Sequence, residues 1–198
     1  AGMPLNWVNT LDNPLKDLAP FEHSPPKRFE FNTVTRGDTY VESILGAWEK
    51  AGAAQVTHRV RVLRAVHKQD WNALHSLATP FGGHRYVNVL AFCTWDEARE
   101  LAHNAGGHLV TIESAEENVF VYSLPPARSG VWLGMLRSVS GAQWITGEPV
   151  TYTGFNDGKP PRFPAPVFMV SVETPEHSWY DATVDPWGVC SVVIEWDK

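Results

Sequence analysis

The chain has 198 residues, 43% of them hydrophobic and 19% charged, and it carries a formal net charge of −6. Nine tryptophans and nine phenylalanines exclude a disordered chain, and only two cysteines exclude a small scaffold held by disulfides. No apolar run reaches the ~18–20 residues that a membrane span needs, and residues 84–198, with 7 basic against 14 acidic side chains, argue against a nucleic-acid partner.

The first 34 residues are predicted to form an irregular arm. They contain five prolines, which remove backbone donors and disfavour helix in the residue before each proline. The same segment carries four large aromatic side chains, Trp7, Phe21, Phe29 and Phe31. Because such side chains are unfavourable in water, we expect the arm to pack against another surface.

Residues 35–83 are predicted to form a small helix/strand/helix extension. Asp38 is a candidate N-cap for a helix whose apolar side chains recur every three or four residues. Apolar and polar residues then alternate over 56–62, which predicts a strand. Apolar spacing over 71–77 predicts a second short helix, ended by the proline and glycines that follow it.

Residues 84–198 are predicted to form an α+β domain. A strand is expected at 86–92, followed by two helices that each begin with a capping box, Thr94–Glu97 and Ser114–Glu117. Beyond the second helix the pattern is one of short strands and loops. Further strands are expected at 108–112, 131–134, 143–145, 167–172 and 190–196.

The order of these motifs resembles the C-type lectin-like domain, over about residues 84–198. The resemblance rests on Gly83-His84-Arg85-Tyr86, Thr94-Trp95-Asp96-Glu97-Ala98-Arg99, Gly106-Gly107-His108-Leu109-Val110-Thr111-Ile112-Glu113-Ser114, Trp132-Leu133-Gly134-Met135, Trp144-Ile145-Thr146-Gly147-Glu148-Pro149 and Ile194-Glu195-Trp196-Asp197. The cysteine-poor form looks most like bacterial members of the family, and the first 80 residues resemble no family. The resemblance implies that the first and last strands pair and that a long loop carries the ligand surface.

In sugar-binding members of the family, two triplets of residues hold a calcium ion that coordinates sugar hydroxyls. Here the first triplet is Lys159-Pro160-Pro161 and the second is Trp179-Tyr180-Asp181. A lysine at a ligand position repels a cation, and a proline side chain offers calcium no oxygen. We therefore expect no calcium-mediated sugar site and no cofactor. A different cation site remains an alternative, built from Asp157, Glu173, Glu176 and Asp181.

The family's disulfide positions fall on Ala102 and Ile194, where a buried apolar pair would replace the covalent link. Cys93 and Cys190 end the first strand and open the last, so they are either two buried thiols or a disulfide pair. The lack of the family disulfides favours a reducing compartment, whereas the usual location of family members favours the cell surface or secretion. The sequence leaves the location open.

No enzyme is expected from the motifs. None of the eight histidines has zinc-site spacing, and no nucleophile elbow, phosphate loop or dinucleotide fingerprint is present. Five tryptophans of this domain are expected to lie in the core rather than on a sugar-stacking surface. They are Trp95, Trp132, Trp144, Trp196 and Trp179.

The remaining polar and aromatic side chains of the second half form the candidate ligand-binding set: Asn156, Asp157, Lys159, Arg162, Tyr180 and Asp181. Lys159 beside Asp181 could replace the calcium ion as an ion pair, or the set could form a recognition patch. The predicted function is a non-enzymatic module that binds a protein or glycan through the long-loop face without calcium. One alternative is an assembly domain that self-associates through its N-terminal extension; another is a calcium-dependent lectin with atypical ligands.

Overall fold

The computed structural model describes residues 46, 50, 54–91, 93–124, 130–155, 164–170, 178–181 and 189–197. The helices in this part of the chain are α3 (Ala54–His67), α4 (Trp71–Ser76), α5 (Trp95–Asn104) and α6 (Ala115–Ser123). The strands are β1 (Thr79–Phe81), β2 (His84–Leu90), β3 (His108–Leu109), β4 (Gly130–Ser138), β5 (Gly141–Trp144), β6 (Ala165–Val170), β7 (Ser178–Asp181) and β8 (Val189–Trp196).

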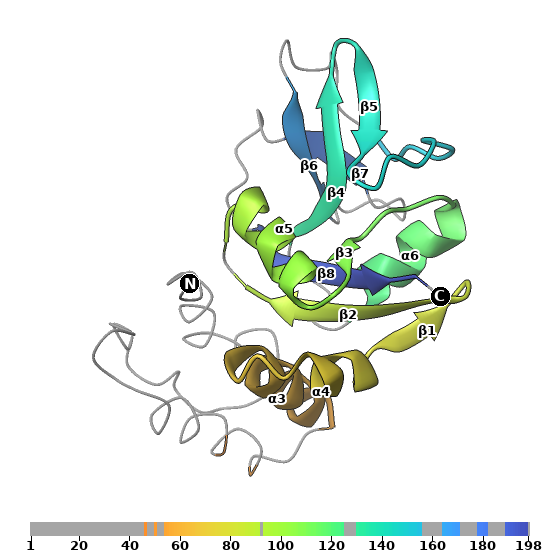
Figure 1. Cartoon of the computed structure of the whole chain (residues 1–198). Coiled ribbons are helices and arrows are strands. Elements are labelled where there is room, and N and C mark those ends of the chain that lie inside the picture. Colours follow the sequence, from red (N-terminus) through yellow and green to blue (C-terminus); the bar gives the residue numbers. More distant parts are fainter. Residues whose placement is uncertain are drawn as a thin grey trace, which may run out of the picture.

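The strands form one sheet in the order β1-β2-β8-β4-β6-β7, with β3 added to β8 and β5 to β4. Strands β2 and β8 pair antiparallel, from Arg85 opposite Trp196 to Leu90 opposite Ser191. The first and last strands of the α+β domain therefore pair, as the resemblance implied. Figure 1 shows α3 and α4 next to the β1–β2 end of the sheet, and β4 to β7 extending away from it.

Helix α5 begins as the sequence predicts. The Thr94 hydroxyl accepts a hydrogen bond from the Glu97 amide, and the Glu97 carboxylate accepts one from the Thr94 amide. The second predicted capping box is wrong in one half. Ser114 caps the Glu117 amide, but the Glu117 carboxylate accepts from the amide of Glu113 instead of that of Ser114.

Two glycines allow the chain to turn from α5 into β3. Gly106 has φ of +77°, which an L side chain rarely adopts. At Gly107, a Cβ atom would clash with the carbonyl oxygen of Glu195. The Gly-Gly pair thus ends the helix and lets β3 approach β8 closely.

The strand predicted over 56–62 is wrong, because these residues belong to α3. The buried side chains Val60, Leu63 and Val66 recur every three residues, which is helical spacing. A short apolar alternation fits one face of a helix as well as a strand. The predicted helix at 71–77 is confirmed as α4, where the carboxylate of Asp70 accepts from the Ala73 amide. The helix predicted from Asp38 lies outside the described residues, apart from helical backbone at 46 and 50.

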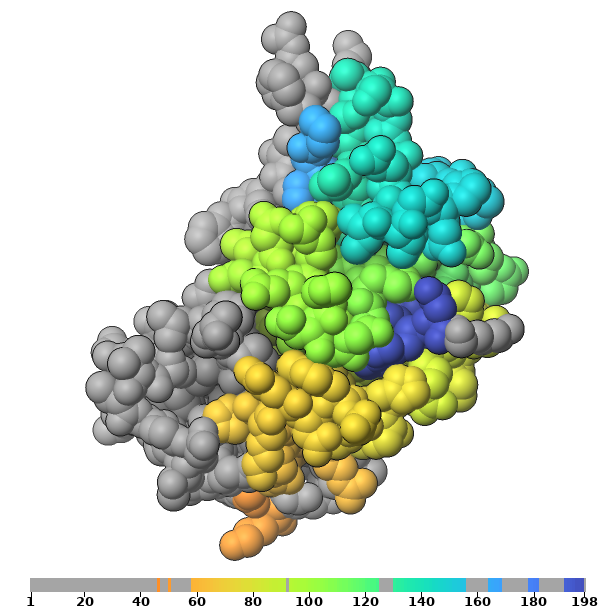
Figure 2. All heavy atoms as spheres, in the orientation of Figure 1, coloured from red at the N-terminus to blue at the C-terminus, as the bar shows by residue number. Residues whose placement is uncertain are grey.

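The core consists of two clusters of buried side chains. Trp95, Trp132 and Trp196 lie in the first, and Trp144 and Trp179 in the second, which confirms their predicted burial. The first cluster also contains the apolar faces of α3 and α4, so these helices share a core with the α+β domain; Figure 2 shows this segment in gold against α5 in green. The domain boundaries at 34 and 83 remain predictions.

Ala102 and Ile194 are both fully buried in the first cluster, where the family's disulfide would lie. Cys93 is a half-buried thiol whose sulfur contacts the Ala91 carbonyl at 3.7 Å. The Cys190 side chain lies outside the described residues, so pairing of the two cysteines remains untested. None of the helices in the described part of the chain has the length and apolar character needed to cross a membrane.

Candidate functional site

Four of the six predicted ligand-binding residues, Asn156, Asp157, Lys159 and Arg162, lie outside the described residues. The other two, Tyr180 and Asp181, lie in β7 at the edge of the sheet. Successive side chains of a strand point to opposite faces. The structure therefore does not bring Tyr180 and Asp181 together, and the sequence missed this because it placed the Trp179-Tyr180-Asp181 triplet in a loop.

Tyr180 is half-buried and packs on one face of β7. Its ring stacks on that of Phe168, with centroids 6.1 Å apart, and Phe168 in turn meets Trp132 edge-on at 5.8 Å. These contacts tie Tyr180 to the first core cluster. The half-buried Tyr180 therefore remains the candidate surface residue of this strand.

Asp181 is buried on the opposite face and lies next to a cation. Nη1 of Arg137 is 3.4 Å from Oδ2 of Asp181, and the two side chains are 11% and 2% exposed. The Arg137 guanidinium also lies over the Phe155 ring, 3.9 Å from its centroid. Sequence reasoning had proposed Lys159 as the partner of Asp181 and missed Arg137. The one available signal was a basic residue within the otherwise apolar segment that became β4.

Trp179 anchors the long-loop region, which is the segment from Gly154 to Trp179. Its indole N–H donates to Oδ1 of Asn118 in α6 at 2.8 Å, and its backbone amide donates to the Gly154 carbonyl at 2.8 Å. Three aromatic rings meet it edge-on with centroids 5.5–5.8 Å away, those of Trp144, Tyr152 and Phe155. The chain on both sides of the long loop is therefore fixed to the second core cluster.

A second polar cluster lies between α6 and the paired strands β2 and β8. The Tyr86 hydroxyl donates to Oε1 of Glu117 and lies 3.2 Å from Oε1 of Glu195. Both the amide and the hydroxyl of Thr111 donate to Oε2 of Glu195, at 2.8 and 3.1 Å. Burial is the main cause that raises the pKa of Glu195, and burial together with the Glu117 contact raises the pKa of Tyr86.

Two histidines extend this cluster to the surface. Nδ1 of His84 lies 2.8 Å from Oε1 of Glu195 and 3.1 Å from Oδ1 of Asp197. Nε2 of His108 lies 3.4 Å from the same Asp197 oxygen. His84 is 111 residues from Glu195 in the sequence and lies on the opposite strand, so local ligand spacing does not reveal that it lies beside Glu195 and Asp197.

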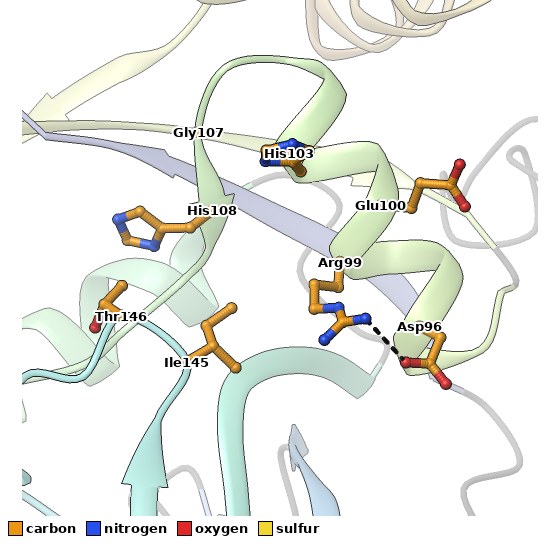
Figure 3. A pocket seen from close by; sticks show the side chains of 8 residues that line it. All are labelled: Asp96, Arg99, Glu100, His103, Gly107, His108, Ile145 and Thr146. Carbon is orange, nitrogen blue, oxygen red and sulfur yellow. Dashed lines mark ion pairs between the residues drawn. The ribbon is translucent and has the colours of Figure 1, made fainter.

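A pocket of about 660 Å³ opens beside His108, between α5, β3 and the turn after β5 (Figure 3). Its walls mix charged and apolar side chains, and Arg99 pairs with Asp96 at 3.6 Å on the α5 side. The lining residues are Asp96, Arg99, Glu100, His103, Gly107, His108, Ile145 and Thr146. The sequence had not predicted a pocket here.

The family model described as "Lectin C-type domain" matches residues 93–185. This match covers both ends of the region that Trp179 anchors. The chain contains a C-type lectin domain. The resemblance to the C-type lectin-like domain, predicted from the sequence motifs, is thereby confirmed.

The curated relatives of this C-type lectin domain include animal proteins. "C-type lectin domain family 4 member G" of Mus musculus is 30% identical over 86 residues, which are 41% of this chain and 29% of that protein. "Snaclec agglucetin subunit alpha-1" of Deinagkistrodon acutus is 38% identical over 73 residues, or 32% of this chain and 47% of that protein. The chain spans about a third of the length of the first curated relatives. These relatives do not support the expected bacterial type.

Solved structures confirm the C-type lectin fold. "Structure of Herring Type II Antifreeze Protein" has a TM-score of 0.52 at 20% identity and covers 61% of this chain and 96% of that one. "Ca2+-independent C-type lectin SPL-2 from Saxidomus purpuratus" has a TM-score of 0.51 at 22% identity and covers 61% and 91%. The predicted α+β class and lectin-like architecture are thus confirmed.

Proposed function

We propose that the chain is a non-enzymatic recognition module that binds a glycan or a protein through its long-loop face without calcium. A recognition role follows from the C-type lectin domain itself. The calcium-independent mode is supported by one observation above all, the buried ion pair between Arg137 and Asp181.

The ion pair supplies the charge that calcium would otherwise provide. By the family resemblance, Asp181 is the acidic residue that would help to hold the ion. A buried carboxylate needs a counter-charge, and the Arg137 guanidinium, seated on the Phe155 ring, provides it. A divalent ion ~4 Å from that guanidinium would be repelled by roughly 8 kcal/mol at an effective dielectric constant of ~20.

Two further observations support the proposal. In the sequence, Lys159 and Pro161 replace the ligands of the family's first calcium triplet. Two of the proteins whose structures share this fold are titled as calcium-independent, the Saxidomus purpuratus lectin and a type II antifreeze protein. A C-type lectin fold thus occurs in proteins that do without calcium, and we extend that mode to this chain.

A glycan array probed with the full chain, in millimolar calcium and in chelator, tests the proposal. We expect the same glycans to be bound in both buffers, and we expect Lys159→Ala and Arg162→Ala to weaken binding at least tenfold. Arg99→Ala, which alters the α5 pocket instead, is the matched control and should bind normally.

Binding that is lost in chelator and restored by calcium alone would contradict the proposal. Full binding by the Lys159 and Arg162 variants, with loss in the Arg99 variant, would move the site to the pocket. The absence of glycan binding in both buffers would direct the search to a protein ligand. Self-association through residues 1–34 also remains a prediction, because that arm lies outside the described residues.

A further inference from the structure

We propose that His84, Glu195 and Asp197 bind a divalent transition-metal ion such as Zn²⁺, at a site separate from the long-loop face. The proposal is independent of the recognition function. The three residues come from the start of β2 and from the end of β8 with the residue that follows it. The antiparallel register of these two strands brings them together.

The donor atoms already lie close to the positions of a coordination shell. One nitrogen and one oxygen from each carboxylate lie within 4.8 Å of one another. The His84 nitrogen is 2.8 Å from one oxygen and 3.1 Å from the other. Two ligands at ~2.0–2.1 Å from a tetrahedral zinc ion are roughly 3.3 Å apart. The two nitrogen–oxygen distances lie within about 0.5 Å of that value, and the two carboxylate oxygens, which lie within 4.8 Å of each other, would move closer together around the ion.

Nδ1 of His84 faces two carboxylates. It is buried and lies at ion-pair distance from both carboxylate oxygens, but it meets hydrogen-bond geometry with neither of them. Buried polar atoms in native structures almost always have a partner. A metal ion between the three side chains would use the nitrogen lone pair directly.

The electrostatic balance also favours a cation. Glu195 is almost fully buried, and the Glu117 carboxylate contacts the same Tyr86 hydroxyl. Among the described residues, the ion pairs of Glu195 and Asp197 are formed only with His84 and His108, and no lysine or arginine takes part. A divalent ion would neutralise this concentration of negative charge.

Neighbouring groups hold the ligands in place. Thr111 donates twice to Oε2 of Glu195, which leaves Oε1 facing His84 and the Tyr86 hydroxyl. Nδ1 of His108 is 2.9 Å from the Leu109 carbonyl, and because a carbonyl only accepts, this nitrogen is the donor. Nε2 of His108 lies 3.4 Å from Oδ1 of Asp197, and it donates to that carboxylate only when the ring carries a proton on both nitrogens. Such outer contacts orient metal ligands.

The ligand types decide the class of ion. Calcium takes six to eight oxygen ligands, and magnesium favours oxygen ligands in an octahedron. An imidazole nitrogen with two carboxylates is a donor set that suits zinc and its first-row neighbours. Three protein ligands also leave at least one coordination position for water or for an outside group.

The test is calorimetric titration of the full chain with Zn²⁺ after treatment with chelator, near neutral pH. We expect one saturable site of micromolar or tighter affinity, and visible absorption bands of tetrahedral or five-coordinate geometry when Co²⁺ is used. His84→Ala and Asp197→Asn should weaken zinc binding at least tenfold. Their side chains are 35% and 60% exposed, so both variants should fold.

His103→Ala is the matched control, because this exposed histidine of α5 lines the nearby pocket but lies outside the ligand set. Its zinc affinity should be that of the unaltered chain. Equal affinity in the His84 and Asp197 variants, or no saturable binding up to millimolar zinc, would overturn the proposal. Glycan binding that fails while zinc binding holds would contradict only the recognition function.

Discussion

Replacing Arg137 with methionine is expected to lower the free energy of unfolding by about 3–5 kcal/mol. The change leaves the Asp181 carboxylate buried without the guanidinium that now lies 3.4 Å away. Methionine retains most of the side-chain stem and can still contact Phe155, so the loss of charge dominates the effect. Urea denaturation of the unaltered chain and of the variant measures it.

Two controls identify the cause. The double variant Arg137→Met with Asp181→Asn should recover much of the lost stability, because the buried side chain that lost its guanidinium no longer carries a charge. Arg99→Met removes an exposed pair, with side chains 55% and 81% exposed, and should change stability by less than about 1 kcal/mol. An Arg137 variant as stable as the Arg99 variant would show that the buried pair does not support the long-loop region.

Replacing Trp179 with alanine is expected to cost about 3–5 kcal/mol and to abolish ligand binding by the long-loop face. The side chain is fully buried, contacts three aromatic rings and donates to Asn118 in α6. Its loss would leave a cavity and remove the hydrogen bond to Asn118 at the point where both ends of the loop are held. Denaturation and the glycan array together measure these effects.

Val139→Ala serves as the comparison, because this side chain is 65% exposed in the turn between β4 and β5. Its effect should stay within about 0.5 kcal/mol. The Trp179 account would be wrong if alanine there cost less than about 1 kcal/mol. It would also be wrong if the destabilised variant still bound ligand normally at a temperature where it is folded.

The fold was predictable where interactions between residues close in the sequence, such as helix caps, are also present in the folded structure. The Thr94–Glu97 capping box and the Gly106–Gly107 stop define α5 in the sequence and in the structure alike. The strand predicted over residues 56–62 was wrong because their apolar alternation is too short to distinguish a strand from a helix. Packing against β2 favours the helix. The short edge strand β7 was missed because its pairing with β6 is a tertiary contact.

The candidate site was less predictable, because its partners are distant in the sequence. Arg137 and Asp181 are 44 residues apart, and Tyr86 and Glu195 are 109 residues apart. Local motifs suggested Lys159 for Asp181 and gave no partner for Glu195. The register of β2 with β8 places Tyr86 beside Glu195, and the registers of β4 with β6 and of β6 with β7 bring Arg137 to Asp181.

The melting temperature of the full chain in millimolar calcium and in calcium-free buffer tests the central claim most directly. An ion that binds the folded state at a hundred times its Kd stabilises it by about 2.7 kcal/mol, which raises Tm by several degrees. With Arg137 already paired to Asp181, we predict the same Tm in both buffers. A rise of several degrees in calcium that disappears in Asp181→Asn would contradict the account.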